Sequence, residues 1–218
     1  MEKLTIAVVF LSMLLHVHLS DACCCPAQFE GLEGVSSGQD INGTTSATEA
    51  LFKMYVDITN QKVAVVGNVS YNGKVMEEQI LQDFNTGKQY TVIMRKCTVT
   101  PMTGKKLKQC LPPDAKLVLS TYYGVGNNKV DIDMYTYMDG GMQSTLSVTK
   151  DGCVPMAEHM KMSTGILDIG FMGLTLGIKD MSVFDIPKGC QNAATVHPYS
   201  PLLHHVMQTG HSGFIRHH

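Results

Sequence analysis

Seven cysteines are the residues whose type and spacing most clearly predict chemistry in this 218-residue chain. Three are contiguous and four are spread along the chain: Cys23, Cys24 and Cys25, then Cys97, Cys110, Cys153 and Cys190. In an oxidising compartment such cysteines form a disulfide framework, and the lack of a Cys-x-x-Cys pair argues against zinc. Adjacent cysteines bridge one another only with strained geometry, so the triplet needs distant partners. Because the count is odd, one thiol stays free, is capped or joins a second chain.

Candidate catalytic residues are few. His159 lies beside Glu158 on the polar side of an alternating stretch, where a histidine is typically a surface residue rather than a base. We expect no Gly-x-Ser-x-Gly nucleophile elbow, and the chain has no His-Glu-x-x-His pair or phosphate-binding loop. The sequence therefore predicts a protein that is not an enzyme and has no catalytic cofactor.

Two further sets of residues have the chemistry of metal ligands. Asp131 and Asp133 share one face of a predicted strand and are candidate calcium ligands, although two carboxylates are too few alone and a solvated strand face is the alternative. Six of the nine histidines fall between His197 and His218. Imidazoles at this density can hold zinc or copper, whereas an unstructured solubilising tail is the alternative.

The N-terminus predicts export. An apolar run from Leu4 to Leu15 follows Lys3, and Ser20 and Ala22 are small, which is typical of a signal peptide over residues 1–22 cleaved before Cys23. The run is shorter than the roughly 20 residues that span a bilayer, so a membrane anchor is not expected. Export ends outside the cell or in the lysosome, and it makes Asn42 and Asn68 candidate N-glycosylation sites.

Composition indicates one globular domain over residues 23–195, followed by a His-rich tail at 196–218. The chain is 44% hydrophobic and 17% charged, which is enough to build a substantial core. Its formal net charge of −2 argues against nucleic acid as a partner, because nucleic-acid-binding proteins carry a basic surface.

The elements that must position these residues are predicted to be β-strands. Apolar and polar residues alternate from Val130 to Met138 and again from Met142 to Thr149, and Asp139-Gly140-Gly141 between them suits a tight hairpin. We assign Val130, Ile132, Met134 and Met138 to the dry side and Tyr135 and Tyr137 to the wet side. Glycines argue against an unbroken helix over 160–179, where extended structure is expected. The pattern predicts a mainly β protein of antiparallel strands.

Three segments resemble the ependymin-related family of secreted glycoproteins. They are the mature start Cys23-Cys24-Cys25-Pro26-Ala27-Gln28-Phe29-Glu30-Gly31, the strand Val148-Thr149-Lys150-Asp151-Gly152-Cys153-Val154-Pro155, and Leu176-Gly177-Ile178-Lys179-Asp180-Met181-Ser182-Val183-Phe184 followed by Ile186-Pro187 and Cys190. The resemblance implies a strongly curved antiparallel sheet, or half-barrel, around a deep apolar pocket, as in bacterial lipoprotein carriers. It also implies lipid binding, calcium association and homodimers. Its disulfides would join Cys23 to Cys153 and Cys97 to Cys190, leaving Cys110 for Cys24 or Cys25.

These observations predict a secreted glycoprotein that binds a lipid or other hydrophobic ligand. Methionine is abundant, and its flexible, polarizable side chain suits an adaptable pocket as well as a closed core. The alternative function is an extracellular matrix or cell-interaction protein in which the sheet is a scaffold and the tail binds metal. The candidate pocket-lining residues are Tyr90, Val92, Met94, Ile132, Met134, Leu146, Met156 and Met160.

Overall fold

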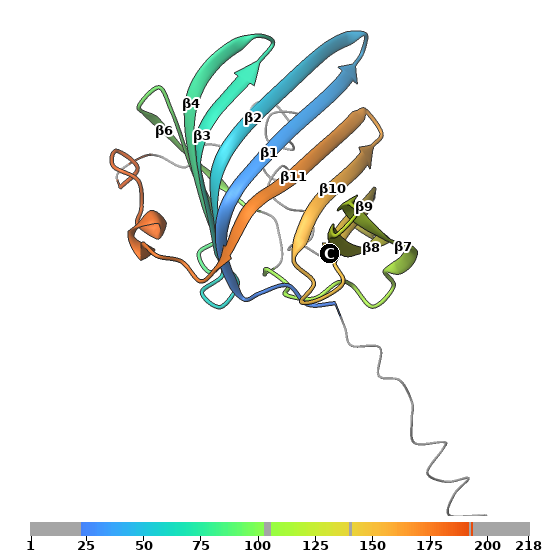
Figure 1. Ribbon diagram of the computed structural model, residues 1–218. Helices are drawn as coiled ribbons and strands as arrows, with labels where there is room; N and C mark the ends of the chain where they lie inside the picture. Colours follow the sequence, from blue (N-terminus) through green and yellow to red (C-terminus); the bar gives the residue numbers. More distant parts are fainter. Residues whose placement is uncertain (1–22, 103–105, 140, 192, 194–218) are drawn as a thin grey trace, which may run out of the picture.

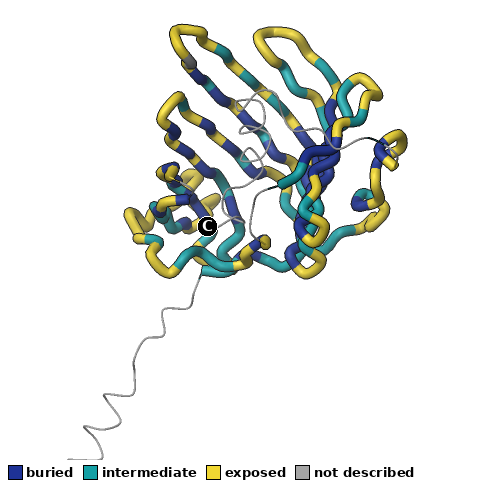
Figure 2. The backbone as a smooth tube through the Cα atoms, turned by 180° about the vertical axis from the view of Figure 1, so that it is seen from behind, coloured by how far each residue is buried: buried dark blue, intermediate teal, exposed yellow. Residues whose placement is uncertain are grey.

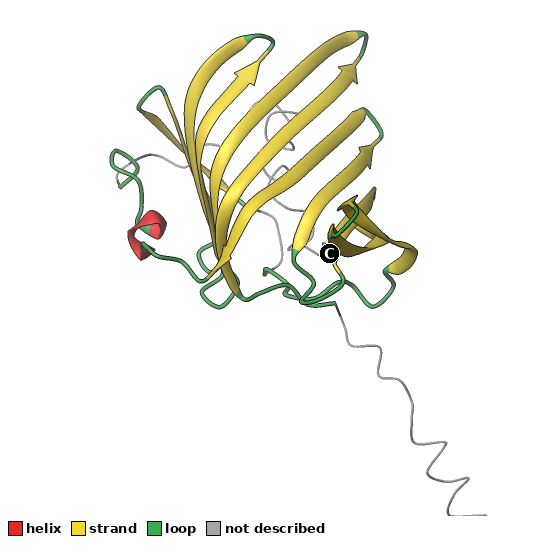
Figure 3. Cartoon of the chain, viewed as in Figure 1, coloured by secondary structure: helices red, strands yellow, loops and turns green. Residues whose placement is uncertain are grey.

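The described residues form a single antiparallel sheet of eleven strands and one short 3-10 helix (Figures 1 and 3). The structure is a computed structural model that describes residues 23–102, 106–139, 141–191 and 193. The predicted mainly β fold with an open, curved sheet is confirmed. The elements are β1 (Gln28–Ile41), β2 (Thr44–Asp57), β3 (Lys62–Tyr71), β4 (Lys74–Asp83), β5 (Lys88–Ile93), β6 (Lys96–Pro101), β7 (Lys116–Val125), β8 (Asn128–Asp139), β9 (Met142–Thr149), β10 (Pro155–Met162), β11 (Gly165–Leu176) and η1 (Met181–Phe184).

The sheet is built from two meanders joined in its middle. Its strand order is β6-β5-β4-β3-β2-β1-β11-β10-β9-β8-β7, so the first and last strands of the chain are neighbours (Figure 1). They pair antiparallel from Phe29 opposite Leu176 to Gln39 opposite Gly165. The sheet does not close, and β6 and β7 form its two edges.

Turn residues account for several of the hairpins. Asn42-Gly43 connects β1 to β2, and both residues have positive φ, which matches the right-handed twist of the strands. Asn72-Gly73 connects β3 to β4 in the same way. The hairpin predicted after Asp139 is present, because Asp139 pairs with Met142. These short turns hold successive strands in antiparallel register.

One face of the sheet carries the main hydrophobic core, and we call it the inner face. Buried residues alternate with more exposed ones along most of the strands, as the colours of Figure 2 show for the described residues. Their apolar character and period of two explain why these segments are strands with one side removed from water. The cluster runs through both meanders and includes Phe29, Val35, Phe52, Met54, Val56, Val63, Val65, Ile80, Leu146, Val148, Met160, Met162, Leu167, Ile169 and Phe171.

The predicted dry side of β8 is wrong. Tyr137 on the predicted wet side is 4% exposed, whereas Val130 and Met138 on the predicted dry side are exposed. Tyr135 lies opposite Leu146 on β9, whose side chain is fully buried on the inner face. Directly opposite residues in a sheet share a face, so β9 determines which side of β8 faces the core.

A second hydrophobic cluster lies on the opposite, outer face over β3 to β6. Ala64, Leu81, Tyr90 and Val99 point outward there and pack with Phe184 and Cys190. Phe184 belongs to η1, which Asp180 caps by accepting a hydrogen bond from the Ser182 backbone N–H. The segment from Ile178 to Cys190 therefore covers this half of the outer face.

Three disulfides attach the chain ends and loops to the sheet. They join Cys23 to Cys153, Cys24 to Cys110 and Cys97 to Cys190, and Cys25 is free and buried. The two bridges implied by the family resemblance are present, and Cys110 pairs with Cys24 rather than Cys25. Burial raises the pKa of the Cys25 thiol to about 12, because a thiolate there would lose its hydration.

Both predicted terminal segments, the signal peptide at 1–22 and the His-rich tail from 196, lie outside the described residues. Within the described part of the chain, no helix is long and apolar enough to span a membrane.

Candidate functional site

The residues predicted to line one pocket are distributed over both faces. Leu146 and Met160 are fully buried on the inner face. Ile132 and Met134 lie on the outer face of β8, because they alternate with Tyr135. Met156 is half-buried at the bulge between β9 and β10. The alternation identified these strands, but for β8 it did not show which face belongs to the main core.

The three pocket candidates from the β5 region also lie on the outer side. Tyr90 belongs to the second cluster and Val92 packs against it, beneath the segment from Ile178 to Cys190. Met94 is 71% exposed in the turn between β5 and β6, where it and Arg95 both have positive φ. Val92, Met94 and Arg95 border a pocket of about 420 Å³. These positions do not continue the inner-face core.

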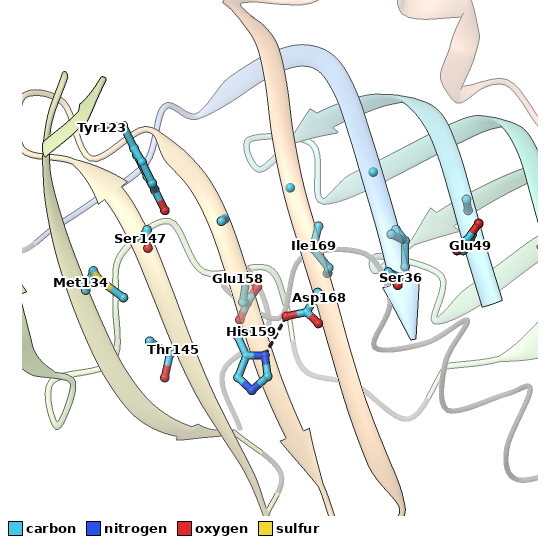
Figure 4. A pocket seen from close by; sticks show the side chains of 15 residues that line it. Ser36, Glu49, Tyr123, Met134, Thr145, Ser147, Glu158, His159, Asp168 and Ile169 are labelled. Atoms are coloured by element: carbon cyan, nitrogen blue, oxygen red, sulfur yellow. Dashed lines mark hydrogen bonds and ion pairs between the residues drawn. The ribbon is translucent and has the colours of Figure 1, made fainter. Parts of the chain in front are cut away.

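A larger groove of about 600 Å³ lies on the part of the outer face that the segment from Ile178 to Cys190 does not cover (Figure 4). Strand register explains its shape. Gly34 on β1 lies opposite Gly170 on β11, which lies opposite Ala157 on β10, which lies opposite Ser147 on β9. Four small residues in one row across four strands leave a trough in the sheet surface, and Met134 continues the row on β8.

A polar row runs parallel to this floor. Ser36 lies between Glu49 and Asp168, and His159 lies between Asp168 and Thr145, all on the same face. The His159 Nδ1 and Asp168 Oδ1 atoms are 2.7 Å apart, and both side chains are about half exposed (Figure 4). Tyr123 lies at the far end of the groove from Glu49. The groove thus combines an apolar floor with a wall of hydrogen-bonding groups.

The glycine at 170 has no evident structural role. A β-carbon built there would meet no atom within 4 Å, and its φ is not in the left-handed region. By contrast, a β-carbon at Gly67 or Gly165 would lie 2.1 Å from a backbone oxygen, which explains those glycines. Glycine weakens a strand interior, so Gly170 leaves open space at a cost to the sheet.

Comparison with known proteins identifies the family. The family model named Ependymin matches residues 72–190. The chain belongs to the ependymin family. Ependymin-related protein 1 of Haliotis asinina is 28% identical over 183 residues, which cover 77% of this chain and 90% of that protein. Development-specific protein LVN1.2 of Lytechinus variegatus is 23% identical over 167 residues, 64% of this chain and 85% of that one.

Solved structures give weaker similarities to this ependymin-family chain. A LolA superfamily protein from Nitrosomonas europaea aligns with a TM-score of 0.33 at 8% identity, covering 73% of this chain and 90% of that one. A β-barrel-like protein of unknown function from Brucella abortus gives a TM-score of 0.30 at 7% identity, covering 71% and 100%.

The sequence of this ependymin-family chain does contain a Gly-x-Ser-x-Gly pattern, so the prediction that it has none is wrong. Gly34-Val35-Ser36-Ser37-Gly38 has this pattern, but it lies inside β1 rather than at a strand-to-helix turn. Asp168 also lies between Ser36 and His159, so the imidazole is not placed between the acid and the hydroxyl as a catalytic triad requires. The residues match a motif whose structural context is absent here.

The predicted calcium ligands do not form a cation site by themselves. Asp131 is exposed, and Asp133 accepts a hydrogen bond of 2.6 Å from the Ser120 hydroxyl. Calcium requires six or more oxygen ligands, which two carboxylates do not supply. Among the described residues, no three histidine, cysteine or acidic side chains are grouped closely enough to hold a metal ion.

The inner face contains a polar pair that the sequence did not reveal. The buried Tyr137 hydroxyl donates a hydrogen bond to Glu158 Oε1 at 2.8 Å. Burial and the neighbouring Glu158 carboxylate raise the pKa of Tyr137 well above its usual value, because both disfavour a phenolate. Glu158 belongs to the inward parity of β10, opposite Leu146, and His159 consequently faces out.

The candidate glycosylation sites are both exposed. Asn42 occupies the turn between β1 and β2, and Asn68 lies on the outer face of β3 opposite Leu51 and Glu77. Both side chains are therefore accessible for modification.

Proposed function

We propose that this ependymin-family protein is a secreted glycoprotein that binds a lipid or other hydrophobic ligand through the inner face of its curved sheet. The observation that carries the proposal is the size of the apolar inner face. Protein domains normally bury such a surface against a second layer of helices or strands. Within the described ranges, no helix and no second sheet lies on it, and η1 lies on the other face. Its side chains are buried within the curved sheet itself and under the segment that includes Leu107 and Leu111, so a ligand would insert between these side chains. A flexible apolar ligand is a natural complement to this surface.

Methionines support the same proposal. Met54, Met142, Met160 and Met162 all belong to the inner-face cluster, and they lie on three strands, β2, β9 and β10. Methionine adapts its shape to irregular apolar partners, so a face rich in it accommodates acyl chains of different lengths.

The absence of tryptophan allows a direct test. Tyr135→Trp places a single indole on the inner face opposite Leu146, and Met172→Trp places one on the outer face. A bromine-labelled fatty acid quenches only an indole that it contacts. We expect strong quenching in Tyr135→Trp and little in Met172→Trp, together with co-purifying lipid in the extracted wild-type protein.

The same pair of variants also defines the contrary result. Quenching restricted to Met172→Trp would place the ligand on the outer face, and lipid-free protein with no quenching in either variant would contradict lipid binding. Phe171→Trp, the inward-facing neighbour of Met172, provides a second inner reporter if Tyr135→Trp alters the fold.

Export and glycosylation are parts of the proposal. Three disulfides are the kind of framework that persists in an oxidising compartment, and Asn42 and Asn68 are exposed. Expression with its own N-terminus in a secreting eukaryotic cell should yield medium-borne protein beginning at Cys23. Digestion with an N-glycosidase should lower its mass, and Asn42→Gln and Asn68→Gln should each remove one step of that shift.

We also propose that the chain forms homodimers through β7. All ten residues of this edge strand are exposed, and Lys116 is its one charged residue. Edge strands without charges or prolines tend to pair with another strand. The two-residue turn after Val125 makes Thr121 a hydrogen-bonded partner of Ile132, so the backbone N–H of Tyr122 points to the open edge. Tyr122→Pro removes this edge donor, and we expect it to shift sedimentation from dimer to monomer. A wild-type monomer at high concentration would contradict this arrangement.

A further inference from the structure

We propose that the outer-face groove is a second ligand site, separate from the inner face, that binds an elongated amphiphilic amine. The ammonium group would lie at Glu49, Ser36 and Asp168, and the apolar chain would cross Gly34, Gly170 and Ala157 toward Met134. The site is on the opposite face from the proposed lipid surface, so the inference does not depend on that proposal.

Charge selects the head group. Glu49 and Asp168 flank Ser36 on neighbouring strands of one face. The described lining of the groove contains these carboxylates, His159 and Glu158, whose side chain points to the inner face, but no lysine or arginine. An ammonium group can donate to a carboxylate and to the Ser36 hydroxyl at once, and such charge-assisted hydrogen bonds are the stronger kind. A fatty-acid carboxylate or an anionic membrane surface would instead be repelled.

The floor selects the shape of the remainder of the ligand. The row Gly34, Gly170, Ala157, Ser147 and Met134 crosses five adjacent strands. Strands are spaced by about 4.8 Å, so the row is roughly 19 Å long. A straight alkyl chain lying across the strands fits this length and contacts mainly Cα–H and methyl groups. Tyr123 lies at the end away from the carboxylates.

Gly170 provides independent support because packing within the protein does not require it. A side chain could extend from this position into open space, yet the strand carries none. Its two neighbours along β11, Ile169 and Phe171, are large and buried on the other face. The lack of a side chain at 170 therefore keeps this part of the groove floor open.

The test compares three ligands that share one chain: decylamine, decanol and decanoate, each below its micelle concentration. Binding is measured by calorimetry with the wild-type protein and with Gly170→Val and Asp168→Asn. We expect decylamine to bind tightest and decanoate weakest. Gly170→Val should weaken decylamine binding more than tenfold, because valine fills the floor. Asp168→Asn should weaken it by about fivefold, the effect of an exposed ion pair, without affecting decanol.

Gly170→Val also separates binding from folding, because valine is preferred in strands and should leave stability unchanged or raise it. Should it destabilise the sheet, Ala157→Leu fills the same floor from β10. Equal affinities for decylamine and decanoate, or unchanged binding when the floor is filled, would overturn the inference. Quenching of Tyr135→Trp by the brominated fatty acid should be the same with or without Gly170→Val, because Tyr135 is on the inner face. This control tests lipid binding at the inner face separately from amine binding in the groove.

Discussion

The two halves of the outer face differ in what covers them. Over β3 to β6 the sheet presents Leu81, Tyr90 and Val99, and the segment ending at Cys190 packs over them. Around β1, β11 and β10 it presents Gly34, Gly170 and Ala157, and a groove remains. The first half is therefore covered by the protein's own segment, because removing large apolar side chains from water stabilises the folded protein. The second half is shaped by small residues and left open to solvent.

The strongest test of this contrast removes the bridge that fastens the cover. Replacing Cys97 and Cys190 by serine opens a connection between residues 93 apart in sequence. The chain-entropy account predicts a loss of about 4 kcal/mol of unfolding free energy. Urea unfolding measures this loss, and limited proteolysis should cut within 178–190 sooner. If the variant resisted protease as well as the wild type, the segment 178–190 would stay packed on the sheet without the Cys97–Cys190 disulfide.

The buried thiol of Cys25 provides a contrast with the solvent-exposed half of the outer face. The raised pKa means that the folded protein keeps the Cys25 thiol protonated. The contribution of this group to the free energy of unfolding is therefore complete below pH 9 and is lost as pH rises toward 12. The loss follows a slope of up to about 1.4 kcal/mol per pH unit. Cys25→Ala should show a shallower alkaline decline in urea unfolding. Parallel curves for the two proteins would contradict the assignment.

Matched leucines compare the two halves directly. Leu81 is 1% exposed beneath the cover, and Leu51 is 53% exposed beside the groove. Leu81→Ala should cost about 3 kcal/mol, since it leaves a cavity, whereas Leu51→Ala should cost less than about 0.5 kcal/mol. Similar costs would show that the open half is covered in solution.

The smallest expected change is at the groove floor. Gly170→Ala adds a methyl group where no atom lies within 4 Å. Its unfolding free energy should stay within about 0.5 kcal/mol of wild type, or rise slightly. Gly165→Ala is the control, since its β-carbon would meet the Gly38 carbonyl oxygen and should be clearly destabilising. Equal effects at 165 and 170 would remove the argument that Gly170 leaves usable space.

Much of the architecture is predictable because it depends on local chemistry. Alternation over 142–149 identified β9 and its buried side, and the glycines after Asp139 identified the hairpin. The family resemblance supplied the bridges at Cys153 and Cys190, which spacing alone does not determine. The choice between Cys24 and Cys25 required the fold, because adjacent residues differ only in the direction of their side chains.

The sites were less predictable because they depend on register between distant strands. Ile132 and Leu146 are both apolar and both buried, yet they lie on opposite faces, and only strand pairing separates them. His159 was correctly expected to be exposed, but its partner Asp168 lies on the next strand. The polar interruption at Asp168 between Leu167 and Ile169 was a signal for an outward position. Nothing local aligned Gly34 with Gly170, since 136 residues separate them along the chain.

The ladder between β1 and β11 imposes an order on biosynthesis. Apart from the pairing of β1 with β11, every strand pairs only with neighbours in sequence, so each meander can assemble while translation continues. Their union must wait until Leu176 has emerged to meet Phe29. Until then, the unfinished protein exposes unpaired strand edges in its middle, and these are the edges to which a chaperone would bind.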